Sequence, residues 1–184
     1  MSGAAGLIDP SNKKIALLIS VLALVLAFSE TLGKAAQTAA LSHNVEASNL
    51  WAFFQAKTIR LTVLRTAAES LDAETGSRAN DAAKSQIESW RKTVTRYDSE
   101  PETKEGRKEL AERAKQSESE RDHAMAAYHH YEVASAAVQI AIVLASAAII
   151  TGYGALAVFA GGLGALGIAF SLVAFFAPTA FHLF

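Results

Sequence analysis

Two short groups of histidine and carboxylate side chains are the first places in this sequence where chemistry could occur. Glu120 and His123 have the Glu-x-x-His spacing that supplies ligands to carboxylate-bridged di-metal sites in helical bundles. Such a site needs a second copy of the motif and further inward-facing glutamates. His129 and Glu132 have the reversed order and do not provide that copy. We therefore expect no metal site, and we expect His129 and His130 to be solvated near a membrane surface.

Other signatures of catalysis are missing from the sequence. It contains no cysteine, which excludes thiol catalysis, disulfides and thiolate metal sites. No phosphate-binding loop, dinucleotide fingerprint, serine elbow or zinc-ligand cluster is present. The formal net charge is −1, and basic residues alternate with acidic ones, so no basic stripe for nucleic acid is found. We expect a protein with no catalytic activity, no cofactor and no nucleic-acid partner.

The segment 49–60 combines aromatic, amide and basic side chains. Its sequence is Asn-Leu-Trp-Ala-Phe-Phe-Gln-Ala-Lys-Thr-Ile-Arg. A ligand-binding site is one interpretation of this segment. We favour helix packing, in which the aromatic side chains of Trp51, Phe53 and Phe54 are buried while the polar side chains face water or an interhelical hydrogen bond.

The elements that must position these residues begin with an apolar run near the amino terminus. Residues 15–33 are long enough to cross a hydrocarbon core of about 30 Å as a helix, if Glu30 lies where its carboxylate reaches water. Residues 1–14 would form an amino-terminal tail. A secretory signal peptide is the alternative interpretation, because the basic pair Lys13 and Lys14 precedes a short apolar core and a small-residue stretch.

The carboxy-terminal part of the chain predicts a membrane hairpin. Residues 133–184 contain no Asp, Glu, Lys or Arg, which is rare in a soluble protein. We predict transmembrane helices over residues 133–151 and 155–176, a glycine turn between them and a tail over residues 177–184. Small residues recur every four positions and should let the backbones approach closely. These packing candidates are Ala137, Ala141 and Ala145 on the second span, and Ala157, Gly161, Ala165 and Ala169 on the third.

Residues 34–132 form the polar part of the chain and carry apolar residues at heptad spacing, which makes a seam that must pack on another helix. Breaks at residues 75–77 and 98–101 divide the region into three helices. Because the chain must return to the membrane face it left, the short middle helix supplies either a tip or the upper part of the return leg. We expect the first helix to run unbroken from the first span. The seam candidates are Trp51, Phe54, Leu61 and Leu64 on the outgoing helix and Leu110 and Ala114 on the returning helix, with Trp51 and Phe54 level with Leu110 and Ala114.

Two parts of the sequence carry a resemblance to a known family. The segment 49–60 and the hairpin entry, residues 129–135 followed by Gln-Ile-Ala at 139–141, resemble the bacterial membrane proteins called domain of unknown function 4337. The resemblance extends over nearly the whole chain. It implies one amino-terminal span, a charged helical region opening with a Trp-aromatic-Gln-Ala-Lys motif, and a two-span hairpin. The family has no established activity, and its basic residues between the last two spans are replaced here by Gly-Tyr-Gly.

These observations predict an all-α membrane protein, with three transmembrane helices and a coiled-coil-like helical domain between the first and the second. We expect a non-enzymatic protein of the bacterial inner membrane that acts by helix–helix association. Its partners would be the lipid bilayer and either further copies of itself or other subunits of a membrane complex. An oligomeric channel or transport-related protein is the alternative. Lys13 and Lys14 favour a cytoplasmic amino terminus and hence a periplasmic helical domain.

Overall fold

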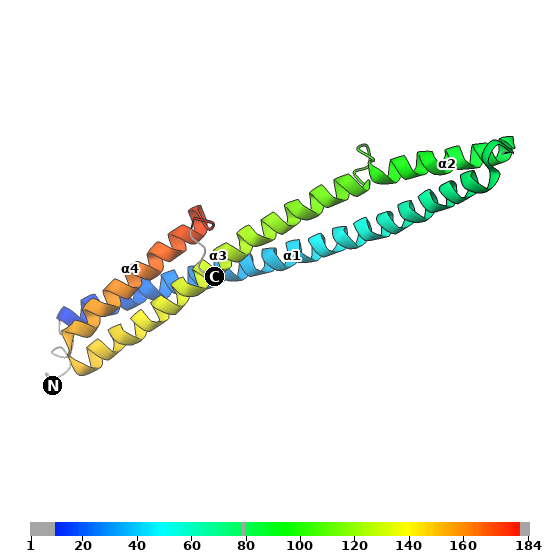
Figure 1. The fold of residues 1–184 in the computed structure, drawn as a ribbon. Helices are drawn as coiled ribbons and strands as arrows, with labels where there is room; N and C mark the ends of the chain where they lie inside the picture. Colours follow the sequence, from blue (N-terminus) through cyan, green and yellow to red (C-terminus); the bar gives the residue numbers. More distant parts are fainter. Residues whose placement is uncertain (1–9, 79, 181–184) are drawn as a thin grey trace, which may run out of the picture. The chain divides into compact units, whose positions relative to one another are not determined.

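The computed structural model describes residues 10–78 and 80–180, and every regular element in these ranges is helical. In chain order these are helix α1 (Pro10–Thr75), a 3-10 turn η1 (Gly76–Arg78), and helices α2 (Asp81–Asp98), α3 (Arg107–Thr151) and α4 (Gly154–Phe176) (Figure 1). The prediction of an all-α fold is confirmed. Residues 1–9 of the predicted amino-terminal tail and residues 181–184 of the carboxy-terminal tail lie outside the described residues.

Local sequence explains where the helices begin and end. Helix α1 runs unbroken through the aromatic segment, which confirms the prediction of a continuous helix, because no Gly or Pro stands between Lys34 and Thr75. The helix stops before Gly76, whose φ of 45° is a left-handed conformation that glycine adopts without strain. Asn80 caps α2, since its side-chain oxygen accepts a hydrogen bond from the Ala83 backbone N–H at 2.8 Å.

The chain divides into two compact units. Unit 1 contains the described residues up to Ala40 and those from Asp122 onwards, and so holds the beginning of α1, the larger part of α3 and all of α4. Unit 2 contains Leu41–Arg121, with the rest of α1, α2 and the beginning of α3.

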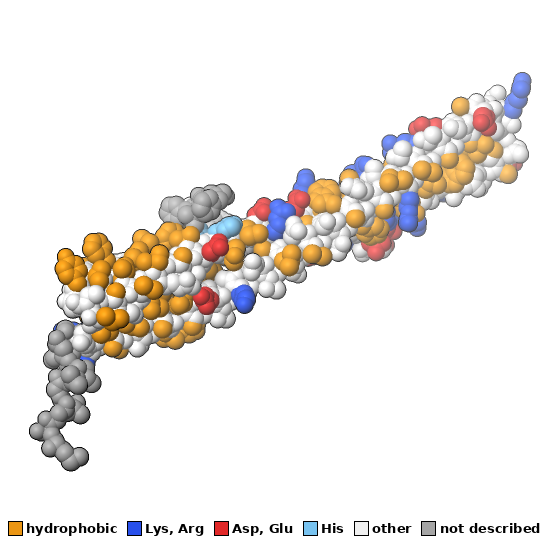
Figure 2. Space-filling view, turned by 90° about the horizontal axis from the view of Figure 1, so that it is seen from below, with side chains coloured by type: hydrophobic (Ala, Val, Ile, Leu, Met, Phe, Trp, Pro, Cys, Tyr) orange, Lys and Arg blue, Asp and Glu red, His pale blue; other side chains and the backbone are white. Residues whose placement is uncertain are grey.

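Unit 1 is a three-helix arrangement built around small residues. Its core consists of Leu22 from α1, Val138, Ala141 and Ala145 from α3, and Ala160 from α4. Hydrophobic side chains also gather on the face of this unit that Figure 2 shows, at the left of the view. By length and composition, α1, α3 and α4 each contain a stretch that is apolar enough to cross a membrane.

Unit 2 pairs α1 with both helices that follow it. Asp72 of α1 and Arg91 of α2 form an ion pair at 2.8 Å, and Ile87 of α2 is buried. Further along, Leu50 of α1 packs on Leu110 of α3. Helix α2 and the beginning of α3 therefore lie one after the other along α1 (Figure 1). Of the two roles considered for the middle helix, the structure gives it the part of the return leg next to the turn.

Candidate functional site

The aromatic segment and the returning helix meet in a small cluster in unit 2. Leu50, Leu110 and Ala114 are buried there, and Trp51 and Phe54 pack against them. The two rings meet edge to face, with their centroids 5.4 Å apart and an interplanar angle of 84°. The structure thus brings together four of the six seam candidates, in the register that the sequence predicts.

The polar edge of this cluster holds the indole in one orientation. Trp51 Nε1 donates a hydrogen bond to Glu118 Oε1 at 2.9 Å, which satisfies the donor that a half-buried indole carries. The remaining seam candidates lie outside the cluster. Leu61 is buried and Leu64 is half-buried on α1.

Lys57 occupies a seam position at which an apolar residue is expected, and the structure shows how its charge is accommodated. The side chain is only 7% exposed. Its ammonium lies 4.8 Å from the centroid of the Tyr97 ring and 5.4 Å from that of Phe53, and 3.8 Å from Glu100 Oε2. Ring faces and a carboxylate thus replace the lost hydration. The aromatic residues Phe53 and Tyr97 were the available sequence signal for this cage. The prediction that Phe53 is buried is wrong, because its side chain lies at the outer edge of the cage and is 37% exposed.

The loop between α2 and α3 is held by one carboxylate. Glu109 Oε1 accepts a hydrogen bond from Ser99 Oγ at 2.5 Å, and Glu109 Oε2 accepts one from the Glu100 N–H at 3.2 Å. The Ser99 hydrogen bond is the main reason why the pKa of Glu109 lies below its usual value. A Cβ at Gly106 would collide with the Glu109 carboxylate and with the backbone at Glu100, so this close approach requires glycine.

Asp98, at the end of α2, is a second carboxylate whose pKa lies below its usual value. Asp98 forms ion pairs with Lys108 at 3.1 Å and with Arg107 at 3.0 Å. The hydrogen bond from Lys108 is the largest cause that holds the pKa of Asp98 below its usual value, and the charges of both basic residues act in the same direction. These contacts tie the end of α2 to the start of α3.

Unit 1 brings together the small residues that the sequence indicated on α3. Ala137, Ala141 and Ala145 are all buried, and the last two pack with Leu22 and Ala160.

The corresponding stripe on α4 differs from the one that the sequence indicated. Ala157 and Gly161 are partly exposed, and Ala165 and Ala169 are exposed. A Cβ on Gly161 would meet nothing within 4 Å. The buried positions of α4 are instead Ala160, Gly164, Gly167 and Ala174. The physical reason is helix geometry: each step of four residues turns about 40° further around the axis, so a strict four-residue repeat drifts off a fixed contact face. Alternating steps of four and three, as in Ala160–Gly164–Gly167, stay on it.

Polar side chains join the helices of unit 1. Ser29 Oγ of α1 and Ser171 Oγ of α4 are 2.8 Å apart. Gln139 Nε2 of α3 donates a hydrogen bond to Glu30 Oε1 of α1 at 3.0 Å. The sequence reasoning missed the first pair, because isolated serines in an apolar run have no distinctive spacing.

The histidines lie in different surroundings from those predicted. His130 was expected to be solvated, yet it is 1% exposed and stacks on Phe170 with ring centroids 6.0 Å apart. Its Nε2 lies 3.0 Å from the Pro178 carbonyl oxygen. The residue faces α4 because it precedes buried Tyr131 and Ala134 on the inner side of α3. His129, by contrast, is half-buried, with its Nδ1 3.7 Å from Glu132 Oε2.

The Glu-x-x-His motif does not gather ligands in the structure. Glu120 pairs with His43, with 3.2 Å between Glu120 Oε2 and His43 Nδ1, and His123 is exposed. Within residues 10–78 and 80–180, no group of three or more histidine and carboxylate side chains is placed to hold a metal ion.

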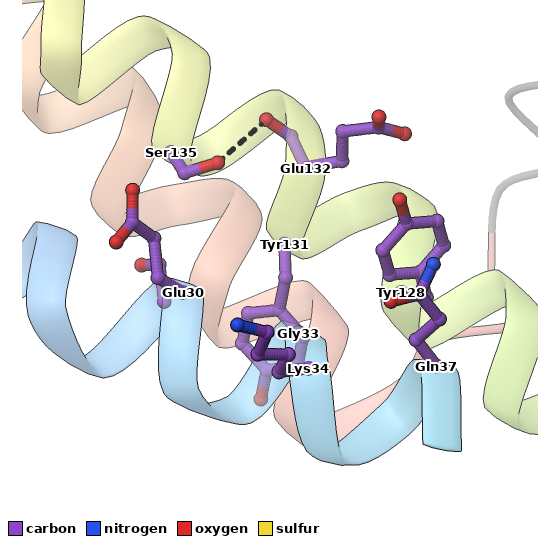
Figure 3. Close-up of a pocket in the computed structure, with 9 residues that line it drawn as sticks. Glu30, Gly33, Lys34, Gln37, Tyr128, Tyr131, Glu132 and Ser135 are labelled. Carbon is purple, nitrogen blue, oxygen red and sulfur yellow. Dashed lines mark hydrogen bonds between the residues drawn. The ribbon is translucent and has the colours of Figure 1, made fainter. Parts of the chain in front are cut away.

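One open pocket of unit 1 collects polar residues at the end of the apolar stretch of α1. It has a volume of about 250 Å³. Figure 3 shows α1 on one side and α3 on the other. The α1 wall holds Ser29, Glu30, Gly33, Lys34 and Gln37, and the α3 wall holds Tyr128, Tyr131, Glu132 and Ser135. The two helices approach each other closely here. A Cβ added to Gly33 would lie 3.1 Å from the Cβ of Tyr131.

Fold and site together define an all-α protein with three long apolar helices and a polar helical unit whose seam is aromatic. A protein-family model matches nearly the whole chain. The chain belongs to the family described as Domain of unknown function (DUF4337), whose model matches residues 11–177. No curated protein and no solved structure gives a significant match to the chain.

Proposed function

We propose that this chain is a non-enzymatic membrane protein that acts by helix–helix association. In this proposal α1, α3 and α4 each cross the bilayer once, and unit 2 is a coiled-coil-like domain outside it. The protein would assemble with further copies of itself or serve as an accessory subunit of a larger membrane complex.

The outward faces of unit 1 support membrane insertion. Large apolar side chains that are more than half exposed occur on all three helices. Exposure of this apolar surface to water would cost much free energy, whereas hydrocarbon chains of lipid can cover it without that cost. They include Leu17 and Phe28 on α1, Val143 and Ile150 on α3, and Val158, Phe159 and Phe176 on α4.

An apolar face of α1 in unit 2 is the observation that carries the association proposal. Leu41, Val45, Ile59 and Val63 are all more than half exposed. At 100° per residue they lie on the side of α1 opposite to the buried seam residues. Ile59 and Val63 lie beyond several charged residues of α1, so hydrocarbon is not available to cover them. We infer that a helix of another protein chain packs against this face.

The test is the mass of the complex extracted in mild detergent, measured for the natural sequence and for an Ile59→Ser/Val63→Ser variant. We expect a mass above that of one chain and its detergent, and a smaller mass for the variant. Glu69→Ser, an exposed change about 120° away from Val63 on the same helix, is the control that should leave the mass unchanged. A single chain under all conditions would refute association.

We also propose an orientation and a compartment. Lys13 and Lys14 are exposed at the start of the apolar stretch of α1, and basic flanks of short segments favour the cytoplasmic side. Three crossings then place the amino terminus in the cytoplasm and unit 2 and the carboxy terminus on the other side. In a bacterial inner membrane unit 2 would face the periplasm.

A further inference from the structure

We propose that the pocket between Glu30, Lys34 and Tyr128 binds the headgroup of an amine-bearing phospholipid such as phosphatidylethanolamine. The inference rests on the membrane insertion proposed above and adds a specific lipid to it.

The position of the pocket fits a headgroup. It lies where the apolar stretch of α1 ends and the first basic residue after it, Lys34, appears. Phospholipid headgroups occupy this boundary in a bilayer. On the apolar side of the pocket the exposed residues of α1 that share a face with Glu30 are small, namely Ala27 and Ala23. This leaves a shallow path for an acyl chain along the helix.

The charges in the pocket match a zwitterion better than an anion. Lys34 has no ion pair within the described residues, so its ammonium is available to a phosphate. Tyr128 and Gln37 add hydrogen-bond donors beside it. Glu30 projects from the same side of α1 one turn away and can accept hydrogen bonds from a primary ammonium. Lys34 and Glu30 are a cation and an anion on the same helix face, and they therefore complement the phosphate and the amine of the headgroup.

The surroundings of Glu30 explain how it is held for this role. One of its oxygens accepts a hydrogen bond from Gln139 of α3, and the carboxylate retains further acceptor positions. Glu132 lines the same pocket, but Figure 3 shows its carboxylate pointing away from α1. The Glu30 carboxylate, one turn from Lys34 on α1, disfavours an anionic headgroup that lacks an amine.

Phosphatidylcholine, whose headgroup carries a quaternary ammonium, would bind more weakly than phosphatidylethanolamine. It carries no N–H, so it cannot donate to Glu30, and it needs an aromatic cage for tight binding. Tyr128 and Tyr131 are the only rings among the residues that line this pocket. The expected order of affinity is therefore phosphatidylethanolamine first, with phosphatidylcholine and phosphatidylglycerol weaker.

Native mass spectrometry of the full chain in detergent tests this order. Each of the three lipids, with identical acyl chains, is titrated separately into the delipidated protein. We expect phosphatidylethanolamine to bind at least about fivefold more tightly than the other two, a difference of about 1 kcal/mol. The variants Lys34→Ala and Glu30→Gln should each remove this preference. Lys115→Ala and Glu112→Gln, exposed changes in unit 2, should retain it.

Two other outcomes have distinct meanings. Equal binding of the three lipids, or an unchanged preference in both pocket variants, overturns the headgroup site while leaving membrane insertion intact. Before the lipid titration, membranes are washed with alkaline carbonate. Release of the protein by this wash would overturn the proposed membrane insertion and the lipid site with it.

Discussion

At the scale of single residues, the glycines of α4 differ sharply in what surrounds them. A Cβ on Gly167 would lie 2.5 Å from Val138 Cγ2 and 3.0 Å from the Ala134 carbonyl oxygen, whereas one on Gly162 would meet nothing within 4 Å. Gly167→Ala should therefore destabilise the protein by about 1–3 kcal/mol through overpacking. Gly162→Ala should be neutral or stabilising by up to about 1 kcal/mol, since alanine is the better helix former. Thermal unfolding in detergent, followed by circular dichroism, compares the two, and equal melting temperatures would contradict the close contact at Gly167.

The aromatic cluster of unit 2 gives a second prediction at this scale. Leu110 is fully buried, so Leu110→Ala should cost about 2–5 kcal/mol. Phe54 is only partly buried, and Phe54→Ala should cost less than the loss of a fully buried ring. Lys115→Ala, an exposed change on the same helix, should stay within about 0.5 kcal/mol. Urea unfolding of the full chain in detergent provides the free energies. A larger loss for Lys115→Ala than for Leu110→Ala would argue against the cluster.

At the scale of elements, the junction between α2 and α3 depends on ionised carboxylates. The pKa values of Asp98 and Glu109 are lowered in the folded protein, by hydrogen bonds and by neighbouring basic side chains. A lowered folded pKa contributes stability that is present above the unfolded pKa and is lost as the pH falls through the folded one.

We therefore expect the melting temperature of the full chain in detergent to fall as the pH drops below about 4. Asp98→Asn should lower the melting temperature at neutral pH and make it less sensitive to acid. Glu112→Gln, an exposed change in the same helix as Glu109, serves as the control and should keep the natural pH profile. An acid profile that Asp98→Asn leaves unaltered would show that the junction does not depend on this carboxylate.

At the scale of the whole molecule, the prediction concerns orientation. Ser77 is exposed in the turn between α1 and α2, and the chain has no natural cysteine, so Ser77→Cys provides a single labelling site. A membrane-impermeant thiol reagent should label it in bacterial cells whose outer membrane alone has been opened. A matched variant, Asn12→Cys, lies before the apolar stretch of α1, keeps both Lys13 and Lys14, and should react only after the inner membrane is lysed. The reverse pattern would invert the proposed orientation.

Most of the architecture could be predicted from the sequence, because it depends on periodicity and composition along the chain. Heptad spacing indicated that Trp51 and Phe54 lie level with Leu110 and Ala114, and the absence of breakers indicated the length of α1. Uncharged runs identified the three apolar helices. These signals are local, since propensity and hydrophobic patterning act through neighbouring residues on one helix.

Contacts between helices were decided only by the tertiary structure. On α4 the four-residue spacing indicated Gly161, whereas packing against Leu22 and Val138 selects Gly164 and Gly167. The burial of Lys57 and His130 likewise depends on which side chains the neighbouring helices present to them. A helix sequence specifies which residues share a face, but the rotation of that face towards its neighbours is set by the shapes of the other helices.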